Sequence, residues 1–299
     1  MKPFELKDAL RGVMAFAPTP FTDDGSLDGD GLARQVDFLC RSGAHVVVVA
    51  GGVGEFYSLD LDEYRHAIRI AVEAAQHRVP VIAGIGHSTR VACQLAAFAE
   101  MVGADGLLVH PFYFVSPPEH GIVQHYRMLA HASALGQIIY HTREAVYAPE
   151  LVERLAAIDN VVALKDELGD LKTFGEMRAR VGERLAWIDG MAELLLAPYL
   201  AAGAQAMTSG IVNFAPQLSL AVWDAGVSGN DAELQQLLNS LVRPLAKMRE
   251  RRKGYAIAVV KEAMNLLGLA GGAVRLPLMP MADEDRAELA GLLMKLSLR

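Results

Sequence analysis

The chain has 299 residues, of which 52% are hydrophobic and 21% are charged, and its formal net charge is -7. This length suits one (β/α)₈ barrel with a small appendage, and so apolar a chain can bury a core that needs no disulfide or metal. The acidic balance argues against a nucleic-acid-binding protein, and 2 cysteines cannot form a disulfide scaffold.

The N-terminal segment MKPFELKDALRG carries charges early and lacks the apolar stretch of a signal peptide. No run of about 18 apolar residues follows, so no membrane-spanning helix is predicted. We therefore expect a cytoplasmic protein.

Short apolar runs alternate along the chain with longer amphipathic ones. The short runs show no polar alternation, which is typical of strands buried on both faces. They lie at residues 12–21, 45–51, 80–86, 105–111, 137–142, 161–167, 185–190 and 205–212. The segments between them have helical periodicity, for example residues 60–77 and 89–102.

This repeated rhythm predicts an α/β fold with a parallel sheet, and eight units without a long gap predict closure into a (β/α)₈ TIM barrel. An open doubly wound sheet is the alternative. After a helix at residues 216–225 the strands stop. We expect a barrel domain over residues 1–228 and a C-terminal helical extension over 229–299, with a loop at 268–280 before the last helix.

Active sites of such barrels lie at the carboxyl ends of the strands. Lys165 is the lysine that ends an apolar strand, in VVALKDE. A desolvated lysine loses its proton more readily, and its neutral amine can attack a carbonyl carbon. The alternative is a structural lysine paired with Asp166 or Glu167.

Tyr140 ends the neighbouring strand, in QIIYHT, where its phenol could relay protons to a bound substrate. The loop GGVGEF after the second strand brings backbone N–H groups of Gly52, Val53 and Gly54 within reach of a carboxylate. A plain tight turn is the alternative for this loop.

The histidines and cysteines show no metal-ligand spacing, so we expect no metal site. His87, His110 and His141 lie at strand ends and could line the pocket, and the sequence does not indicate which of them does.

Six motifs occur together and in order: PTPF, GGVGEF, HPFYF, IIY, LKDE and MTSGIVN. As a set they resemble the dihydrodipicolinate synthase / N-acetylneuraminate lyase superfamily over nearly the whole chain. The resemblance implies a barrel with a helical extension, no cofactor, and a class I aldolase-type Schiff base with a small 2-keto acid. It also implies a homo-oligomer, a tetramer or dimer, for which the aromatic loop 111–118 is a candidate interface.

By position in the family motifs, the resemblance implies that Lys165 is the Schiff-base lysine and Tyr140 the catalytic tyrosine. It also implies that the GGVGE loop binds the substrate carboxylate. Tyr113 matches an aromatic residue that reaches a neighbouring subunit's site. The remaining residues expected to bind substrate are Gly190, Thr208, Ser209 and Asn213.

Within the superfamily, GGxGEF, KDxxGD and the tail GYAIAVVKEA…VRLPL are closest to the 5-dehydro-4-deoxyglucarate dehydratase branch. That branch dehydrates and decarboxylates its sugar diacid. The chain departs from the family pattern at Val53, where threonine is usual, at His141, where asparagine is common, and at Ala145, where the synthases carry arginine. Arg143 is a candidate substitute for that arginine, and the dehydratases usually have Ser-Ser-Ala at positions 208–210.

Three functions remain open from sequence. The first is a Schiff-base lyase acting as 5-dehydro-4-deoxyglucarate dehydratase or a close relative. The second is a synthase-like condensation of pyruvate with an aldehyde. The third is a catalytically impaired paralogue that binds a keto acid, for which Val53 is the best support.

Overall fold

The structure, a computed structural model, describes residues 1–112 and 115–295. Eight parallel strands form a closed barrel in chain order. They are β1 (Gly12–Phe16), β2 (Val46–Val49), β3 (Val81–Ile85), β4 (Gly106–Val109), β5 (Gly136–His141), β6 (Val161–Asp166), β7 (Ala186–Asp189) and β8 (Ala206–Ser209). Because β1 pairs with β8, the sheet has no edge, which confirms the barrel and excludes the open sheet.

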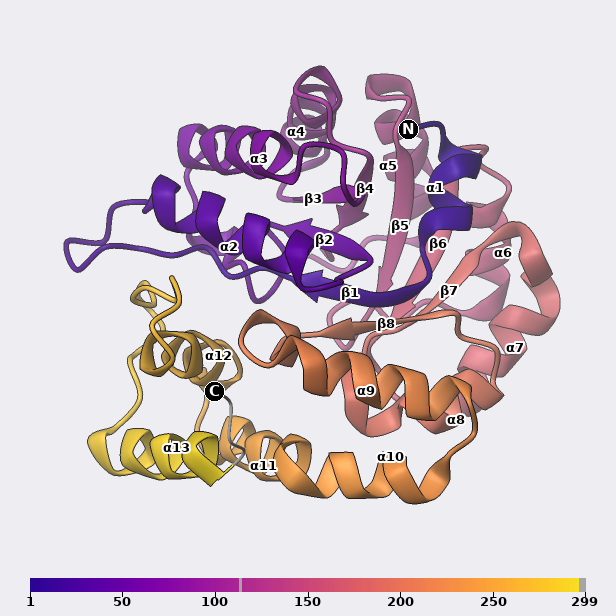
Figure 1. Ribbon diagram of the computed structural model, residues 1–299. Coiled ribbons are helices and arrows are strands. Elements are labelled where there is room, and N and C mark those ends of the chain that lie inside the picture. The colour runs from indigo at the N-terminus through magenta and orange to yellow at the C-terminus, as the bar shows by residue number, and fades with distance from the viewer. Residues whose placement is uncertain (113–114, 296–299) are drawn as a thin grey trace.

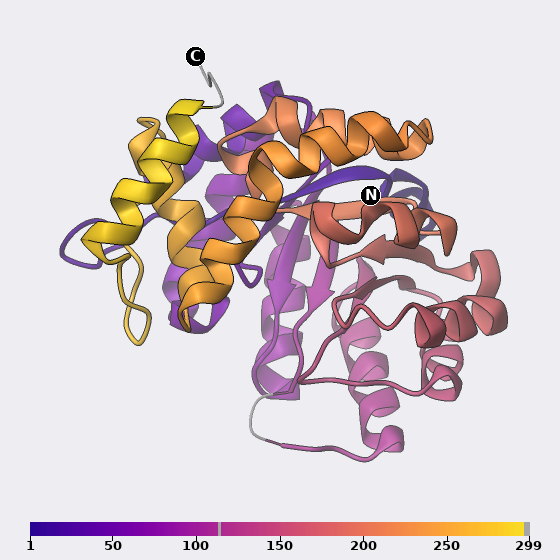
Figure 2. The same cartoon turned by 90° about the horizontal axis from the view of Figure 1, so that it is seen from below.

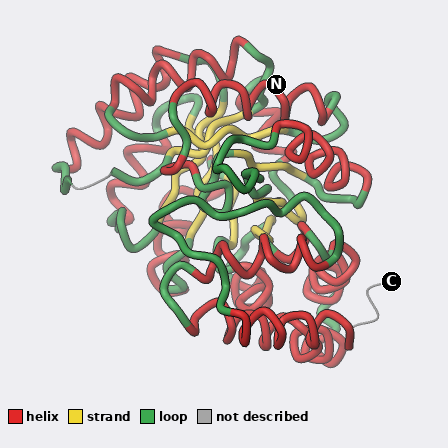
Figure 3. The backbone as a smooth tube through the Cα atoms, turned by 90° about the vertical axis from the view of Figure 1, so that its left-hand side faces the viewer, coloured by secondary structure: helices red, strands yellow, loops and turns green. Residues whose placement is uncertain are grey.

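Helices surround the strands, as Figure 3 shows. Those of the barrel are α2 (Gly29–Arg41), α3 (Leu61–Ala75), α4 (Thr89–Met101), α5 (Glu119–Ala132), α6 (Pro149–Ala156), α7 (Leu171–Val181), α8 (Leu196–Ala201) and α9 (Pro216–Val227). Their sequences explain their ends. Asp60, for example, accepts hydrogen bonds from the first turn of α3, and Glu63 returns one to the backbone of Asp60.

The strands are buried on both faces because the sheet lies between two apolar layers. In β2, Val46 and Val48 belong to the barrel interior, while Val47 and Val49 pack toward the helices. The N-terminal helix α1 (Pro3–Ala9) contributes Leu6 to the interior cluster and contacts β5 and β6. It therefore closes the end of the barrel where the strands begin.

After α9 the chain continues in helices alone: α10 (Asp231–Leu237), a π-helical turn η5 (Leu238–Val242), α11 (Arg243–Arg251), α12 (Tyr255–Leu266) and α13 (Asp283–Lys295). They lie together beside the barrel in Figures 1 and 2. The expected boundary at 228/229 falls between α9 and α10; the division into two domains stays a prediction.

Several strands are shorter than predicted. The apolar run from residue 12 leaves the sheet after Phe16, because the next residues are Ala17, Pro18, Thr19 and Pro20, and proline cannot donate to a ladder. The run from residue 205 turns after Ser209 into a 3₁₀ helix, Ile211–Asn213. No helix in the described part of the chain has the length and apolar character that crossing a bilayer requires.

Candidate active site

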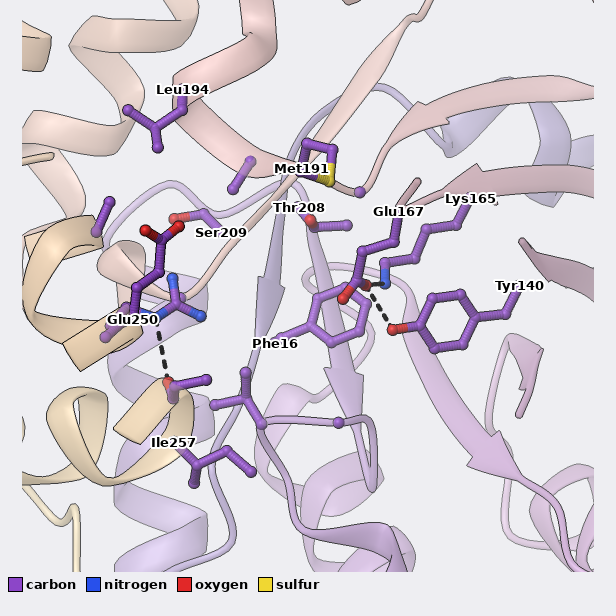
Figure 4. A pocket seen from close by; sticks show the side chains of 18 of the residues that line it. Phe16, Tyr140, Lys165, Glu167, Met191, Leu194, Thr208, Ser209, Glu250 and Ile257 are labelled. Carbon is purple, nitrogen blue, oxygen red and sulfur yellow. Dashed lines mark hydrogen bonds and ion pairs between the residues drawn. The ribbon is translucent and has the colours of Figure 1, made fainter. Parts of the chain in front are cut away.

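A pocket of about 500 Å³ opens at the carboxyl ends of the strands (Figure 4). Strands, loops and the C-terminal helices all contribute to its wall. Its lining residues are Phe16, Gly52, Val53, Tyr57, Tyr140, Lys165, Glu167, Gly190, Met191, Ala192, Leu194, Thr208, Ser209, Gly210, Ala246, Arg249, Glu250, Ala256 and Ile257.

Lys165 lies near the end of β6 and is 3% exposed. Its Nζ lies 3.6 Å from the centroid of the Tyr140 ring and 5.0 Å from that of Phe16. Burial lowers the pKa of Lys165, and the nearby Glu167 carboxylate only partly opposes that shift. A lysine in such a pocket has an increased share of the neutral, nucleophilic amine.

Glu167 forms hydrogen bonds with both predicted catalytic residues, Lys165 and Tyr140. Its Oε2 accepts a hydrogen bond of 2.5 Å from the Tyr140 hydroxyl and another from Lys165 Nζ. Burial alone would raise the pKa of Glu167, but the Lys165 ammonium and these hydrogen bonds outweigh burial and lower it. Burial raises the pKa of Tyr140, and the Glu167 carboxylate raises it further. Tyr140 therefore stays a neutral phenol that can donate a proton.

The glycine-rich loop places Gly52 and Val53 on the pocket wall. Within the described residues, no acceptor pairs with the backbone N–H of Val53 or Gly54. Gly51 is needed here, because a Cβ at this position would lie 2.8 Å from the Phe16 ring. The loop thus presents free donors of the kind that bind a carboxylate.

Glu55, at the end of this loop, has a left-handed backbone with φ 51° and is buried. Its carboxylate accepts a hydrogen bond of 2.5 Å from Lys261 of α12 and one of 3.1 Å from the backbone N–H of Arg275. The C-terminal helices therefore hold the glycine-rich loop in place.

Gly190 and Thr208 also line the pocket, as does Ser209. A Cβ on Gly190 would lie 2.5 Å from the Asp166 carbonyl oxygen and 3.1 Å from Lys165 Cγ, so only glycine leaves room for the lysine stem. Ser209 donates a hydrogen bond of 2.5 Å to the buried Glu193. Its hydroxyl is thus directed at a protein group.

Two of the residues expected to bind substrate are not among the residues lining the pocket. Asn213 is fully buried: its amide nitrogen donates to the carbonyl of Phe16 at 2.9 Å, and its oxygen accepts from Gln35 at 3.1 Å. Gly54 instead packs against the segment that follows β1, where its carbonyl accepts a hydrogen bond from Thr19 at 2.7 Å. Tyr113 lies outside the described residues.

The histidines at strand ends have structural partners. His141 contacts Asp166 at 2.5 Å, and Tyr199 donates to the other oxygen of that carboxylate. His110 contacts the Ala50 carbonyl at 2.9 Å and stacks on Phe56, and burial lowers its pKa to about 4. Arg143 is exposed and does not line the pocket.

No sequence motif indicates that the C-terminal helices reach this pocket. Arg249 of α11 lines it, and burial lowers its pKa against the opposing pull of Glu193 and Glu167. From sequence, an arginine in a polar helix is expected to lie on the protein surface. Arg249 faces the pocket because α11 packs against the barrel mouth. Among the described residues, no group of three or more histidine, cysteine, aspartate or glutamate side chains is placed to hold a metal ion.

Comparison with known proteins identifies similar sequences. The model of the family described as "Dihydrodipicolinate synthetase family" matches residues 9–296. A protein of Azotobacter vinelandii named "Probable 5-dehydro-4-deoxyglucarate dehydratase" is 35% identical, with 99% of each chain covered. A protein of Allorhizobium ampelinum with the same name is 37% identical, with 98% of each chain covered.

Solved structures show the same architecture. Dihydrodipicolinate synthase of Oceanobacillus iheyensis superimposes with a TM-score of 0.93 at 30% identity, covering 99% of this chain and 100% of that one. A prophage protein of E. coli K12 from the dihydrodipicolinic acid synthase family, solved in complex with pyruvate, has a TM-score of 0.87 at 27% identity. That alignment covers 97% of this chain and 99% of that one.

Proposed function

The chain belongs to the dihydrodipicolinate synthetase family and is an enzyme of the lyase or aldolase kind, and we propose that it converts 5-dehydro-4-deoxyglucarate, or a close relative, through a Schiff base on Lys165. One observation carries the proposal: a buried lysine with a lowered pKa shares a pocket with a neutral tyrosine hydroxyl and a carboxylate.

In the first step the pocket binds the keto acid and forms the imine. The backbone N–H groups of Gly52 and Val53, which line the pocket, offer hydrogen bonds to the carboxylate next to the ketone. The neutral amine of Lys165 then attacks the keto carbon. Loss of the carbonyl oxygen as water leaves a protonated imine, which acts as an electron sink.

The imine makes both later bond cleavages possible. A proton leaves the carbon next to the imine, and the hydroxyl on the following carbon departs as water. The far carboxylate then leaves as CO₂, and its bonding electrons flow through the conjugated system to the imine nitrogen. Protonation and hydrolysis release 2,5-dioxopentanoate and return Lys165, so that the sugar diacid has lost one water and one CO₂.

The named relatives support this substrate over others. Proteins called "Probable 5-dehydro-4-deoxyglucarate dehydratase" are 32% to 37% identical over nearly the whole chain. The solved synthases, which favour the alternative of condensing pyruvate with an aldehyde, are 30% identical or less. Ala145 also offers no charge at the position where synthases carry arginine.

The test measures products. The enzyme is incubated with 5-dehydro-4-deoxyglucarate, and CO₂ and 2,5-dioxopentanoate are quantified; a second reaction contains pyruvate and aspartate semialdehyde. We expect equal amounts of the two products, and none with Lys165→Ala. Condensation of pyruvate without CO₂ release would favour the synthase alternative, and turnover in neither reaction would favour the impaired paralogue.

A further inference from the structure

The carboxylate of Glu167 lies between the amine of Lys165 and the hydroxyl of Tyr140, as Figure 4 shows. One oxygen, Oε2, accepts hydrogen bonds from both groups. The Glu167 side chain is 38% exposed, so it also faces the pocket. This oxygen is therefore within proton-transfer distance of both residues that we expect to act on the substrate.

Two other polar side chains nearby are engaged elsewhere. Ser209 donates to Glu193, and His141 contacts Asp166. The Val53 side chain lines the pocket but carries no polar atom. Among the described pocket residues, Glu167 is the group with contacts to both Lys165 and Tyr140.

We propose that Glu167 is a catalytic acid–base residue that carries protons from Lys165 to Tyr140 while the imine forms. The inference rests on the Schiff-base function proposed above. An ammonium and a ketone become a protonated imine and water, so two protons must move from Nζ to the departing oxygen. Glu167 takes each proton from Nζ and passes it to Tyr140 as the phenol gives its own proton to that oxygen. Both residues end in their starting states.

A carboxylate suits this role for a physical reason. The buried phenol of Tyr140 resists becoming a phenolate, because desolvation and the Glu167 charge both disfavour a second anion. A protonated Glu167 held 2.5 Å away can return a proton as the phenol gives one up. The relay thereby avoids an isolated phenolate.

If Glu167 is only a structural counter-ion, its removal should have the opposite effect on the rate of imine formation. A counter-ion stabilises the ammonium of Lys165, so its removal leaves more neutral amine and speeds or preserves attack on the ketone. Removal of a proton carrier slows the same step. Glu167→Gln separates the two roles, because glutamine keeps the shape but takes up no proton.

The experiment follows imine formation with pyruvate by rapid mixing, borohydride quenching and intact-chain mass. Wild type, Glu167→Gln and the control Glu176→Gln are compared; Glu176 is an exposed residue of α7, and its variant removes the same charge. We expect adduct formation to slow by about 100-fold or more in Glu167→Gln and to be unchanged in the control. At long times Glu167→Gln should still reach the wild-type adduct level, which shows an intact site.

A rate for Glu167→Gln within about threefold of wild type, or above it, overturns the relay. Absence of any adduct in wild type, with pyruvate and with 5-dehydro-4-deoxyglucarate alike, instead contradicts the proposed function, so the two failures are distinguishable. If the glutamine variant does not fold, Glu167→Asp replaces it. The shorter carboxylate should slow adduct formation by about tenfold, and a wild-type rate would again overturn the inference.

Discussion

Tyr140 and Lys165 are direct partners in the ladder between β5 and β6, and the Lys165 Nζ lies 3.6 Å from the Tyr140 ring centroid. Paired positions on neighbouring parallel strands point their side chains the same way, here into the barrel mouth. Burial in this mouth lowers the pKa of Lys165, although the Glu167 carboxylate opposes the shift. The strand register thus sets both the position and the reactivity of the lysine.

Tyr140→Phe should separate the ring from the hydroxyl. Phenylalanine keeps the aromatic face against Nζ but removes the donor to Glu167. We expect kcat with 5-dehydro-4-deoxyglucarate to fall about 100- to 10,000-fold, as is typical when a general acid–base group is removed. Borohydride trapping should still detect an adduct at Lys165. A kcat within a few-fold of wild type would show that the hydroxyl takes no part.

Lys261→Met should destabilise the fold through the glycine-rich loop. Lys261 is 1% exposed and pairs with the fully buried Glu55, which the substitution would leave without its ammonium partner. Breaking a buried pair in this way costs about 3–5 kcal/mol. The free energy of unfolding, measured by urea denaturation, should fall by this amount.

The double variant Glu55→Gln/Lys261→Met is the control for that loss. It removes the uncompensated charge as well as the lysine, so it should recover part of the stability. If the double variant is as unstable as the sum of the two single variants, the pair contributes through packing rather than charge.

Asp189→Asn should change how stability depends on pH. Burial raises the pKa of Asp189 well above its ordinary 3.8, although the backbone N–H of Met191 donates to it at 2.7 Å. A raised folded pKa contributes stability that is full below the unfolded pKa and is lost as the pH rises toward the folded one. Wild type should therefore lose about 1.4 kcal/mol per pH unit in this window relative to Asp189→Asn.

Melting temperatures of both proteins between pH 4 and pH 8 test this prediction. The difference in favour of Asp189→Asn should grow with pH. A constant difference across the range would mean that Asp189 titrates alike in the folded and unfolded chain.

The barrel could be predicted because its signal is local and repeated. Apolar runs such as VVVV in β2, followed by amphipathic segments such as α3, specify strand and helix without knowledge of the contacts they make. Lys165 and Tyr140 could be selected as candidates because barrel chemistry gathers at strand ends. The apolar runs overestimate the lengths of the strands, because apolar residues continue into loops such as the one after Phe16.

The rest of the pocket depends on contacts between distant segments. Arg249 reaches the pocket because α11 packs over the barrel mouth, and no local pattern encodes that approach. Asn213 has a side chain that could bind a substrate. Its side-chain amide instead forms hydrogen bonds with the Phe16 carbonyl and with Gln35 in the core. Glu167 was visible beside Lys165 in sequence, but its contact with Tyr140 follows only from the pairing of β5 with β6.

Trapping of the imine tests directly whether Lys165 forms a Schiff base with a keto acid. The full-length protein is incubated with pyruvate, and separately with 5-dehydro-4-deoxyglucarate, then reduced with borohydride and analysed by intact mass and peptide mapping. We expect one reduced adduct per chain, located on Lys165 and absent from Lys165→Ala. An adduct that persists in Lys165→Ala, or a wild-type chain that traps neither compound, would contradict this expectation.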